Sequence, residues 1–187
     1  MRIFSFKPSL TLKGRKFKGA RGFAGKPFHP PLTDIPVGAY ILAPIFEIIS
    51  FLFKEQGWSK DMYHAATYVY IVGAAFSLLA AFTGFIDWLK STEKGTQARR
   101  TANAHMAVML VLTAIVLVNI VLRVTVFLHD NYSSLLLVIF SIVIGLLVTI
   151  GGTLGGALAY EYGFNVETAG DSPVWHKSEE DVMHGQK

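Results

Sequence analysis

The sequence predicts an all-α fold, a bundle of four transmembrane helices with a polar tail at each end of the chain. Two observations favour this fold. Of the 187 residues, 52% are hydrophobic and only 16% are charged, a composition too apolar for an ordinary soluble domain. The sequence also contains four apolar stretches of the length that a helix needs to cross a bilayer, about 20 residues. The two-residue alternation of a transmembrane β-barrel is absent from the long apolar run at 134–150.

Hydropathy divides the chain into three regions. Residues 1–34 are predicted to form a basic cytoplasmic tail, residues 35–160 the transmembrane domain and residues 161–187 a polar C-terminal tail. Within the transmembrane domain, we expect helices over residues 35–53, 62–89, 104–128 and 133–160. Asp34 followed by Pro36 is typical of a helix start, because aspartate caps free N–H groups and proline lacks the N–H that the first turn leaves unbonded.

The fourth predicted helix carries a repeated pattern of small residues. Gly151, Gly152, Gly155 and Gly156 are spaced so that pairs four residues apart share a face. Small residues allow helix backbones to approach closely in lipid, where no hydrophobic force drives helices together. The pattern therefore predicts that this helix packs tightly against a neighbour.

Lysine and arginine are concentrated at one predicted membrane face. Eight of them precede residue 27 without any acidic residue, and Lys90, Lys94, Arg99 and Arg100 follow in the connection between the second and third spans. The other two connections hold only two basic residues. Because basic residues favour the cytoplasmic side, we expect both termini in the cytoplasm. The basic tail suits anionic lipid headgroups, so we expect membrane lipids and not nucleic acid as its partner.

The chain contains no cysteine. Disulfides, thiolate-bound zinc, iron–sulfur clusters and covalently attached c-type haem are therefore excluded for this chain. No hydrolase, kinase, nucleotide-binding or zinc-protease motif is present, and the glycines at 151–156 lie inside an apolar helix and not between a strand and a helix. We therefore predict a protein that is not an enzyme.

Topology brings polar residues from several helix ends to the predicted cytoplasmic boundary. The set comprises His29 and His105 as candidate ligands and, as their neighbours, Asp34, Asp87, Arg99 and Arg100. Two imidazoles could ligate a b-type haem or, together with the carboxylates, a divalent metal. Alternatively, the set forms the caps and ion pairs typical of a membrane boundary, such as Asp87 with Arg99 or Arg100. The residues leave both interpretations open and predict no dedicated metal site.

Two charged residues lie deeper in the predicted spans. Glu47 falls near the middle of the first span and Arg123 in the outward half of the third. A lone charge at such depth costs at least about 2–3 kcal/mol, so each residue needs a partner. We expect Glu47 and Arg123 to form an intramembrane ion pair. A role in locking the bundle is favoured over proton transfer, because a relay would need further titratable groups along the same path.

Four motifs occur in order along the chain. They are residues 29–38 (HPPLTDIPVG), residues 83–88 (TGFIDW), Arg99-Arg100 with His105, and residues 155–160 (GGALAY). Together they resemble a bacterial family of uncharacterised four-helix membrane proteins, a domain of unknown function, over roughly residues 29–166. Some relatives are joined to Rieske-type or cytochrome c domains, so the resemblance implies an electron-transfer setting. Other branches have a second histidine at position 34, where this chain has aspartate. This departure counts against haem ligation through the first motif and leaves His29 and His105 as the one candidate pair. The resemblance also implies location in a bacterial inner membrane.

These observations support three functions in order of preference. The first is a non-catalytic membrane subunit that anchors or bridges a larger redox complex, respiratory or photosynthetic, with other membrane subunits as partners. The second is a small b-type haem or quinone-linked electron-transfer protein that uses His29 and His105. The third is a proton or solute transporter, which would need a polar path through the bilayer that the spans hardly offer.

Overall fold

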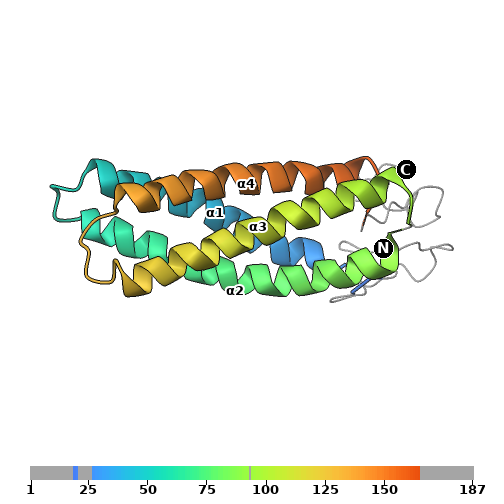
Figure 1. The fold of residues 1–187 in the computed structure, drawn as a ribbon, viewed down its shortest axis with the longest axis horizontal. Helices are drawn as coiled ribbons and strands as arrows, with labels where there is room; N and C mark the ends of the chain where they lie inside the picture. Colours follow the sequence, from blue (N-terminus) through green and yellow to red (C-terminus); the bar gives the residue numbers. More distant parts are fainter. Residues whose placement is uncertain (1–18, 21–26, 93, 165–187) are drawn as a thin grey trace, which may run out of the picture.

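The computed structural model describes residues 19–20, 27–92 and 94–164. The described part contains four helices: α1 (His29–Leu52), α2 (Ser59–Ser91), α3 (Gln97–Thr125) and α4 (Leu135–Tyr160). Each of them is long and apolar enough to cross a membrane. The predicted all-α fold with four membrane spans is therefore confirmed (Figure 1).

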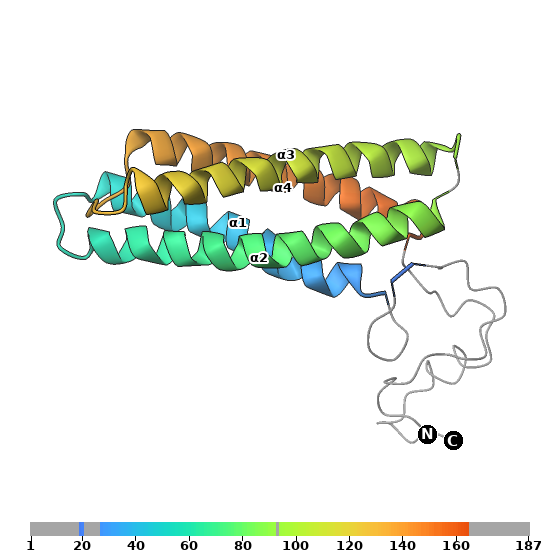
Figure 2. The same cartoon turned by 60° about the horizontal axis from the view of Figure 1, so that its bottom comes forward.

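The helices run up and down in an elongated bundle (Figure 1). Each helix packs against two others, so that α1 and α3 lie diagonally opposite each other across the bundle, as do α2 and α4. The starts of α1 and α3 and the ends of α2 and α4 meet at one end, which we call the terminal end (Figure 2). The α1–α2 and α3–α4 connections lie at the opposite end, which we call the loop end.

α1 begins well before residue 35, where hydropathy predicts its start. Pro30 and Pro31 take the first positions of the helix, where a missing N–H costs nothing. Asp34 and Pro36 therefore lie inside the helix, and the prediction that Asp34 caps its start is wrong. Hydropathy missed these first turns because they are polar, although they continue the same helix as the apolar stretch. His29 thus belongs to a helix and not to a tail.

α3 likewise begins at Gln97 and not at residue 104. Thr96 caps this helix by accepting a hydrogen bond of 3.2 Å from the Arg99 N–H. His105 therefore lies about two turns inside α3 and not at its start. The remaining helix bounds differ from the predicted ones by three residues or fewer, which is the usual uncertainty of helix ends.

Alanine and branched aliphatic side chains fill the centre of the bundle together with two tyrosines. The buried cluster consists of Ala39, Tyr40, Ala43, Ala66, Tyr70, Ala74, Leu112, Val116, Ile144 and Val148. Large apolar side chains such as Phe82 and Leu146, 67% and 60% exposed, cover the outside of the helices. An apolar outer surface of this kind suits lipid tails and not water. The protein is therefore an integral membrane protein whose helices contact lipid.

Candidate functional site

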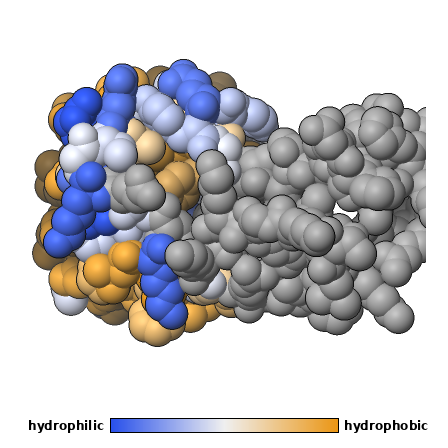
Figure 3. Space-filling model, turned by 90° about the vertical axis from the view of Figure 1, so that its right-hand side faces the viewer, coloured by the Kyte–Doolittle hydropathy of each residue, from blue (hydrophilic) through white to orange (hydrophobic). Residues whose placement is uncertain are grey.

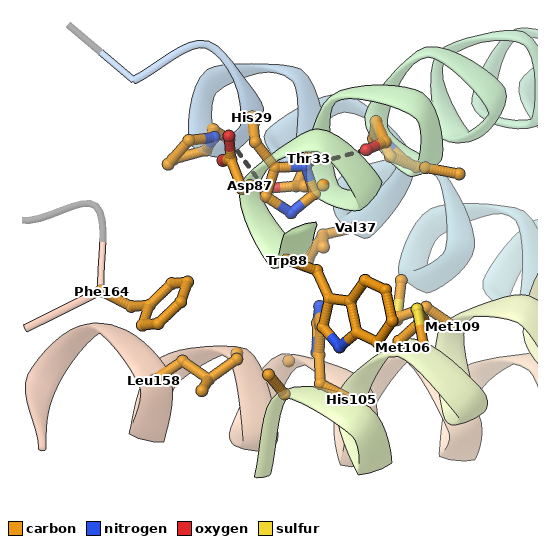
Figure 4. Close-up of a pocket in the computed structure, with 18 of the residues that line it drawn as sticks. His29, Thr33, Val37, Asp87, Trp88, His105, Met106, Met109, Leu158 and Phe164 are labelled. Carbon is orange, nitrogen blue, oxygen red and sulfur yellow. Dashed lines mark hydrogen bonds between the residues drawn. The ribbon is translucent and has the colours of Figure 1, made fainter. Parts of the chain in front are cut away.

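A cavity of about 630 Å³ lies at the terminal end of the bundle, and all four helices contribute to its wall (Figure 4). Its hydrophobic lining includes Val37, Trp88, Met106, Met109, Leu158 and Phe164. Its polar groups include the two histidines that the sequence singles out, His29 on α1 and His105 on α3. A largely apolar wall with a few convergent polar groups is typical of a binding site for a small organic molecule or a cofactor.

The His29 ring is held by α2. Its Nδ1 lies 2.9 Å from the Ala80 carbonyl oxygen and 3.3 Å from the Thr83 hydroxyl oxygen. A carbonyl oxygen can only accept, so Nδ1 carries the proton and donates it. The ring also lies against Gly84, where an added Cβ would come within 2.7 Å of the ring Cε1. In the neutral ring, Nε2 therefore keeps its lone pair.

The His105 ring is held by α4 in the same way. Its Nδ1 lies 2.9 Å from the Gly151 carbonyl oxygen and donates to it. A Cβ added at Gly155 would lie 3.1 Å from the ring Cε1. In Figure 4, His29 and His105 approach the cavity from opposite sides. Neither Nε2 has a hydrogen-bond partner among the residues that the structure describes.

The surroundings of the two histidines, which we call the histidine seats, repeat each other: Ala80 and Gly84 around His29, and Gly151 and Gly155 around His105. In both, the histidine of the first helix of a hairpin donates to a carbonyl of the second helix and packs on the glycine four residues further along. The second helices of the hairpins correspond at one offset in sequence, since 71 residues separate Ala80 from Gly151 and 71 separate Gly84 from Gly155. The first helices correspond at a different offset, since 76 residues separate His29 from His105. The α1–α2 hairpin is thus repeated by the α3–α4 hairpin, although sequence reasoning did not detect a repeat.

Because α1 lies opposite α3 and α2 lies opposite α4, the repeat relates the two hairpins by an approximate two-fold axis along the centre of the bundle. Residues at equivalent positions in the two hairpins contact each other at two depths, Tyr70 with Ser141 and Glu47 with Arg123. A third equivalent pair, His29 and His105, lies on opposite sides of the cavity (Figure 4). The Tyr70 hydroxyl donates to Ser141 Oγ at 2.8 Å, and the charged residues form an ion pair. Residues related by a two-fold axis can touch only at that axis. The two histidines therefore flank the axis from either side of the cavity.

The two predicted aspartate neighbours differ in environment. Asp34 is exposed and contributes to the wall of the cavity. Asp87 also contributes to the wall but is only 2% exposed, and one of its carboxylate oxygens accepts a hydrogen bond of 2.8 Å from the Ala20 N–H. The structure thus brings both carboxylates to the site that the histidines share.

The two predicted arginine neighbours lie outside the wall of the cavity. The Arg99 guanidinium lies 3.6 Å above the centre of the Trp88 ring and donates to the Trp88 carbonyl oxygen. Arg100 is exposed and points its guanidinium at the Gly95 carbonyl oxygen. In the part of the chain that the structure describes, neither arginine forms an ion pair with Asp87, so the ion pair considered as an alternative is not found there.

The glycine pattern on α4 divides between two roles. Gly151 and Gly155 face α3, where they lie against Met109 and His105. Gly152 meets no other atom within 4 Å at its Cβ position, and Gly156 meets only its own helix. Gly152, Gly155 and Gly156 also line the cavity. One row of the predicted glycine pattern, Gly151 and Gly155, therefore packs against α3. The adjacent row, Gly152 and Gly156, leaves space beside the cavity.

The predicted partners Glu47 and Arg123 meet in the half of the bundle nearer the loop end. Both side chains are buried, and the Arg123 Nη2 contacts the Glu47 Oε2. Arg123 also donates to Asn119 Oδ1 at 2.7 Å and to Thr67 Oγ1 at 2.9 Å. The sequence pointed to the ion pair but not to the hydrogen bond from Arg123 to the Thr67 hydroxyl. That contact depends on how α2 and α3 pack, and the residue types alone do not indicate it.

Comparison with known proteins agrees with this architecture. Residues 25–168 match the family described as "Predicted membrane protein (DUF2231)", and this region includes all four helices. No curated protein and no solved structure matches the chain. The match confirms the resemblance to an uncharacterised membrane family that the four motifs indicate. The chain belongs to the DUF2231 family, and it is an integral membrane protein with four spans.

Proposed function

We propose that this protein is a small b-type cytochrome in which His29 and His105 ligate one haem iron in the cavity at the terminal end. The observation that carries the proposal is the matched pair of histidine seats. In each seat Nδ1 donates to a backbone carbonyl, and Nε2 is left with its lone pair. A metal-ligating histidine almost always donates its other N–H in this way, which fixes the ring and raises the basicity of the ligating nitrogen.

The cavity suits a large, mostly apolar cofactor. Its volume of about 630 Å³ falls within the range of sites that enclose drug-sized molecules. Glycines at positions 84 and 155 let each imidazole lie close to its neighbouring helix, where a Cβ would push it away. A planar cofactor with two equivalent faces, bound on the two-fold axis, would meet one histidine on each face.

A haem suits this site better than a bare divalent metal. The described residues contain no group of three or more His, Cys, Asp or Glu side chains that could hold a metal ion. A haem iron needs only two axial ligands from the protein, because the porphyrin supplies the other four nitrogens. Two histidines are therefore a complete protein ligand set for haem and an incomplete one for a bare ion.

An oxidised quinone suits the site less well than a haem. Its carbonyl oxygens are hydrogen-bond acceptors, and the lone pairs on Nε2 of His29 and His105 are acceptors as well. Two acceptors cannot pair with each other. A metal centre accepts those lone pairs directly, so it uses the tautomer that the backbone carbonyls impose.

A bound haem would supply one-electron transfer. The chain would hold and orient it through the two histidines and keep water away with hydrophobic side chains such as Met106 and Met109. This proposal adopts the second of the three functions predicted from the sequence and is compatible with the first, because a haem-carrying subunit can also anchor a peripheral redox partner. We expect electron transfer without substrate chemistry, and hence no enzymatic activity of the chain alone.

The transporter alternative is not favoured. A transport path would have to connect the cavity with the Glu47–Arg123 pair through the middle of the bundle. Apolar side chains occupy that region, among them Leu112, Val116, Ile144 and Val148. A charged or polar solute would be desolvated there without compensation.

We infer that the terminal end faces the cytoplasm of a bacterial cell. Hydrophilic residues gather on this end (Figure 3), and Lys90, Lys94 and Arg100 are exposed there. The cysteine-free chain allows a direct test with single-cysteine variants. In intact cells, an impermeant thiol reagent should label Lys54→Cys at the loop end and spare Lys94→Cys. The opposite labelling pattern would show that the orientation is reversed.

Haem binding can be tested with purified protein in detergent. After reconstitution with haemin, the wild type and the control His129→Ala, an exposed loop histidine, should each hold one haem per chain with a six-coordinate, low-spin spectrum. His29→Ala and His105→Ala should each lose that spectrum and most of the haem. The proposal fails if the wild type binds no haem in stoichiometric amount, or if both substitutions leave the spectrum unchanged.

A further inference from the structure

We propose that water enters the bundle from the loop end and occupies a site beside the Glu47–Arg123 ion pair, between Glu47 Oε1 and Asn119 Nδ2. The site lies far from the proposed haem cavity, because Glu47 is about 27 Å along α1 from His29. It therefore does not depend on haem binding.

The first observation is a set of buried polar atoms without partners. Within the described residues these are Glu47 Oε1, Asn119 Nδ2 and Ser133 Oγ, and all three residues are 0% exposed. Leaving a buried donor or acceptor unpaired costs about 1–3 kcal/mol. Buried groups of this kind in native proteins are usually satisfied once ordered water is counted. All three atoms lie in the half of the bundle nearer the loop end.

The second observation is that two of these atoms are complementary. Arg123 joins the two residues, because its Nε donates to Asn119 Oδ1 at 2.7 Å and its Nη2 contacts Glu47 Oε2. The remaining Glu47 oxygen can only accept, and the Asn119 amide nitrogen can only donate. A water molecule does both, so one water can satisfy the pair. An ion fits less well, since Arg123 repels a cation and Glu47 repels an anion.

The third observation is a route of hydroxyl groups to the loop end. Ser50 lies one turn beyond Glu47 on the same face of α1. Its hydroxyl donates to the Ser59 carbonyl oxygen at 3.0 Å and accepts from the Ser133 N–H at 3.1 Å, and the Ser59 hydroxyl donates to the Ser50 carbonyl oxygen at 2.8 Å. The neighbouring Ser133 hydroxyl is the third unpaired group, so among these described residues it is the one group of the series that is free to bind water, and we take it as the entrance of the route.

Toward the terminal end, the described residues include no buried hydroxyl without a partner. The Tyr40 hydroxyl pairs with Ser77 and the Tyr70 hydroxyl with Ser141, each at 2.8 Å, and neither pair offers a group like Ser133 Oγ. The surrounding core is apolar. Water beside the ion pair would therefore connect Glu47 with solvent on the loop-end side alone.

Water-edited solid-state NMR of the isotope-labelled protein in lipid bilayers tests the proposal. Magnetisation should pass from water to Asn119 Nδ2 and Glu47 Cδ much faster than to Val148, a buried core side chain that is not part of the cavity wall. Slow transfer at Asn119 and Glu47, matching that at Val148, would overturn the proposal.

The route can be tested separately from the site. Ser133→Val replaces the hydroxyl at the entrance with methyl groups and should slow the transfer to Glu47 several-fold. Ser141→Val changes an equally buried serine off the route and should leave the transfer unchanged. Unchanged transfer in Ser133→Val, or equal slowing in both variants, would refute entry from the loop end.

Discussion

Removing one charge of the Glu47–Arg123 pair should destabilise the bundle far more than removing both. Arg123→Met leaves the buried Glu47 carboxylate without its cation, and breaking a buried ion pair in this way costs about 3–5 kcal/mol. The same substitution removes the hydrogen bonds to Asn119 and Thr67, worth about 0.6 kcal/mol each inside a membrane protein. We therefore expect a loss of about 4–6 kcal/mol for Arg123→Met and about 3–5 kcal/mol for Glu47→Met.

The double variant leaves neither charge unpaired. Two methionines of similar length fill the same space, and replacing a buried ion pair by apolar residues is often close to neutral. The double variant should therefore be more stable than either single variant. The resulting coupling energy between Glu47 and Arg123 is expected to be at least about 3 kcal/mol.

The cycle can be measured by unfolding the purified protein in mixed micelles with increasing fraction of denaturing detergent and following helicity. A matched control is the neutral pair Tyr40–Ser77, probed with Tyr40→Phe and Ser77→Ala. Its coupling should be about 0.6 kcal/mol and no more than about 1.7 kcal/mol. Additive effects of the two charge substitutions, within about 0.5 kcal/mol, would refute the contact and the reasoning built on it.

Three further substitutions test other contacts. Gly84→Ala places a methyl 2.7 Å from the His29 ring and should lower the haem content per chain. The control Gly38→Ala has nothing within 4 Å of its Cβ and should leave the haem content unchanged. Equal haem content in the two variants would argue against the proposed packing of His29 on Gly84. Ser134→Ala removes the α4 cap and should cost about 1 kcal/mol in detergent unfolding, and no change would mean that water replaces the cap. Arg99→Gln removes the guanidinium stacked on Trp88 and should cost about 0.5–1 kcal/mol and alter tryptophan emission; unaltered emission would count against the stacking.

The four spans were predictable because lipid imposes a simple demand, a sufficient length of apolar helix. The same demand explains the errors at helix starts. His29 and Gln97 begin helices whose first turns are polar, and hydropathy does not distinguish such turns from a tail or a loop. The contact between Glu47 and Arg123 was predictable because each charge needed a partner and few were available at that depth.

The geometry of the histidine seats was not predictable from hydropathy or from the histidines alone. Which carbonyl meets His29 depends on how α1 and α2 slide past each other, and Ala80 carries no side-chain signal for that contact. One signal was nevertheless present in the sequence. Glycines follow the same register in both hairpins, 71 residues apart at positions 84 and 155, and a search for an internal repeat would have found it.

The near-equivalence of the two hairpins affects how an asymmetric cofactor would sit between them. A haem, whose edges carry different substituents, can enter such a site in two rotational isomers related by half a turn, with both axial bonds preserved. Only positions at which the hairpins differ can discriminate between the isomers. Asp87 in one hairpin corresponds to Leu158 in the other, and Trp88 corresponds to Ala159, and all four line the cavity. Paramagnetic proton NMR should therefore resolve two sets of haem methyl signals, in a ratio that exchanging these side chains would alter.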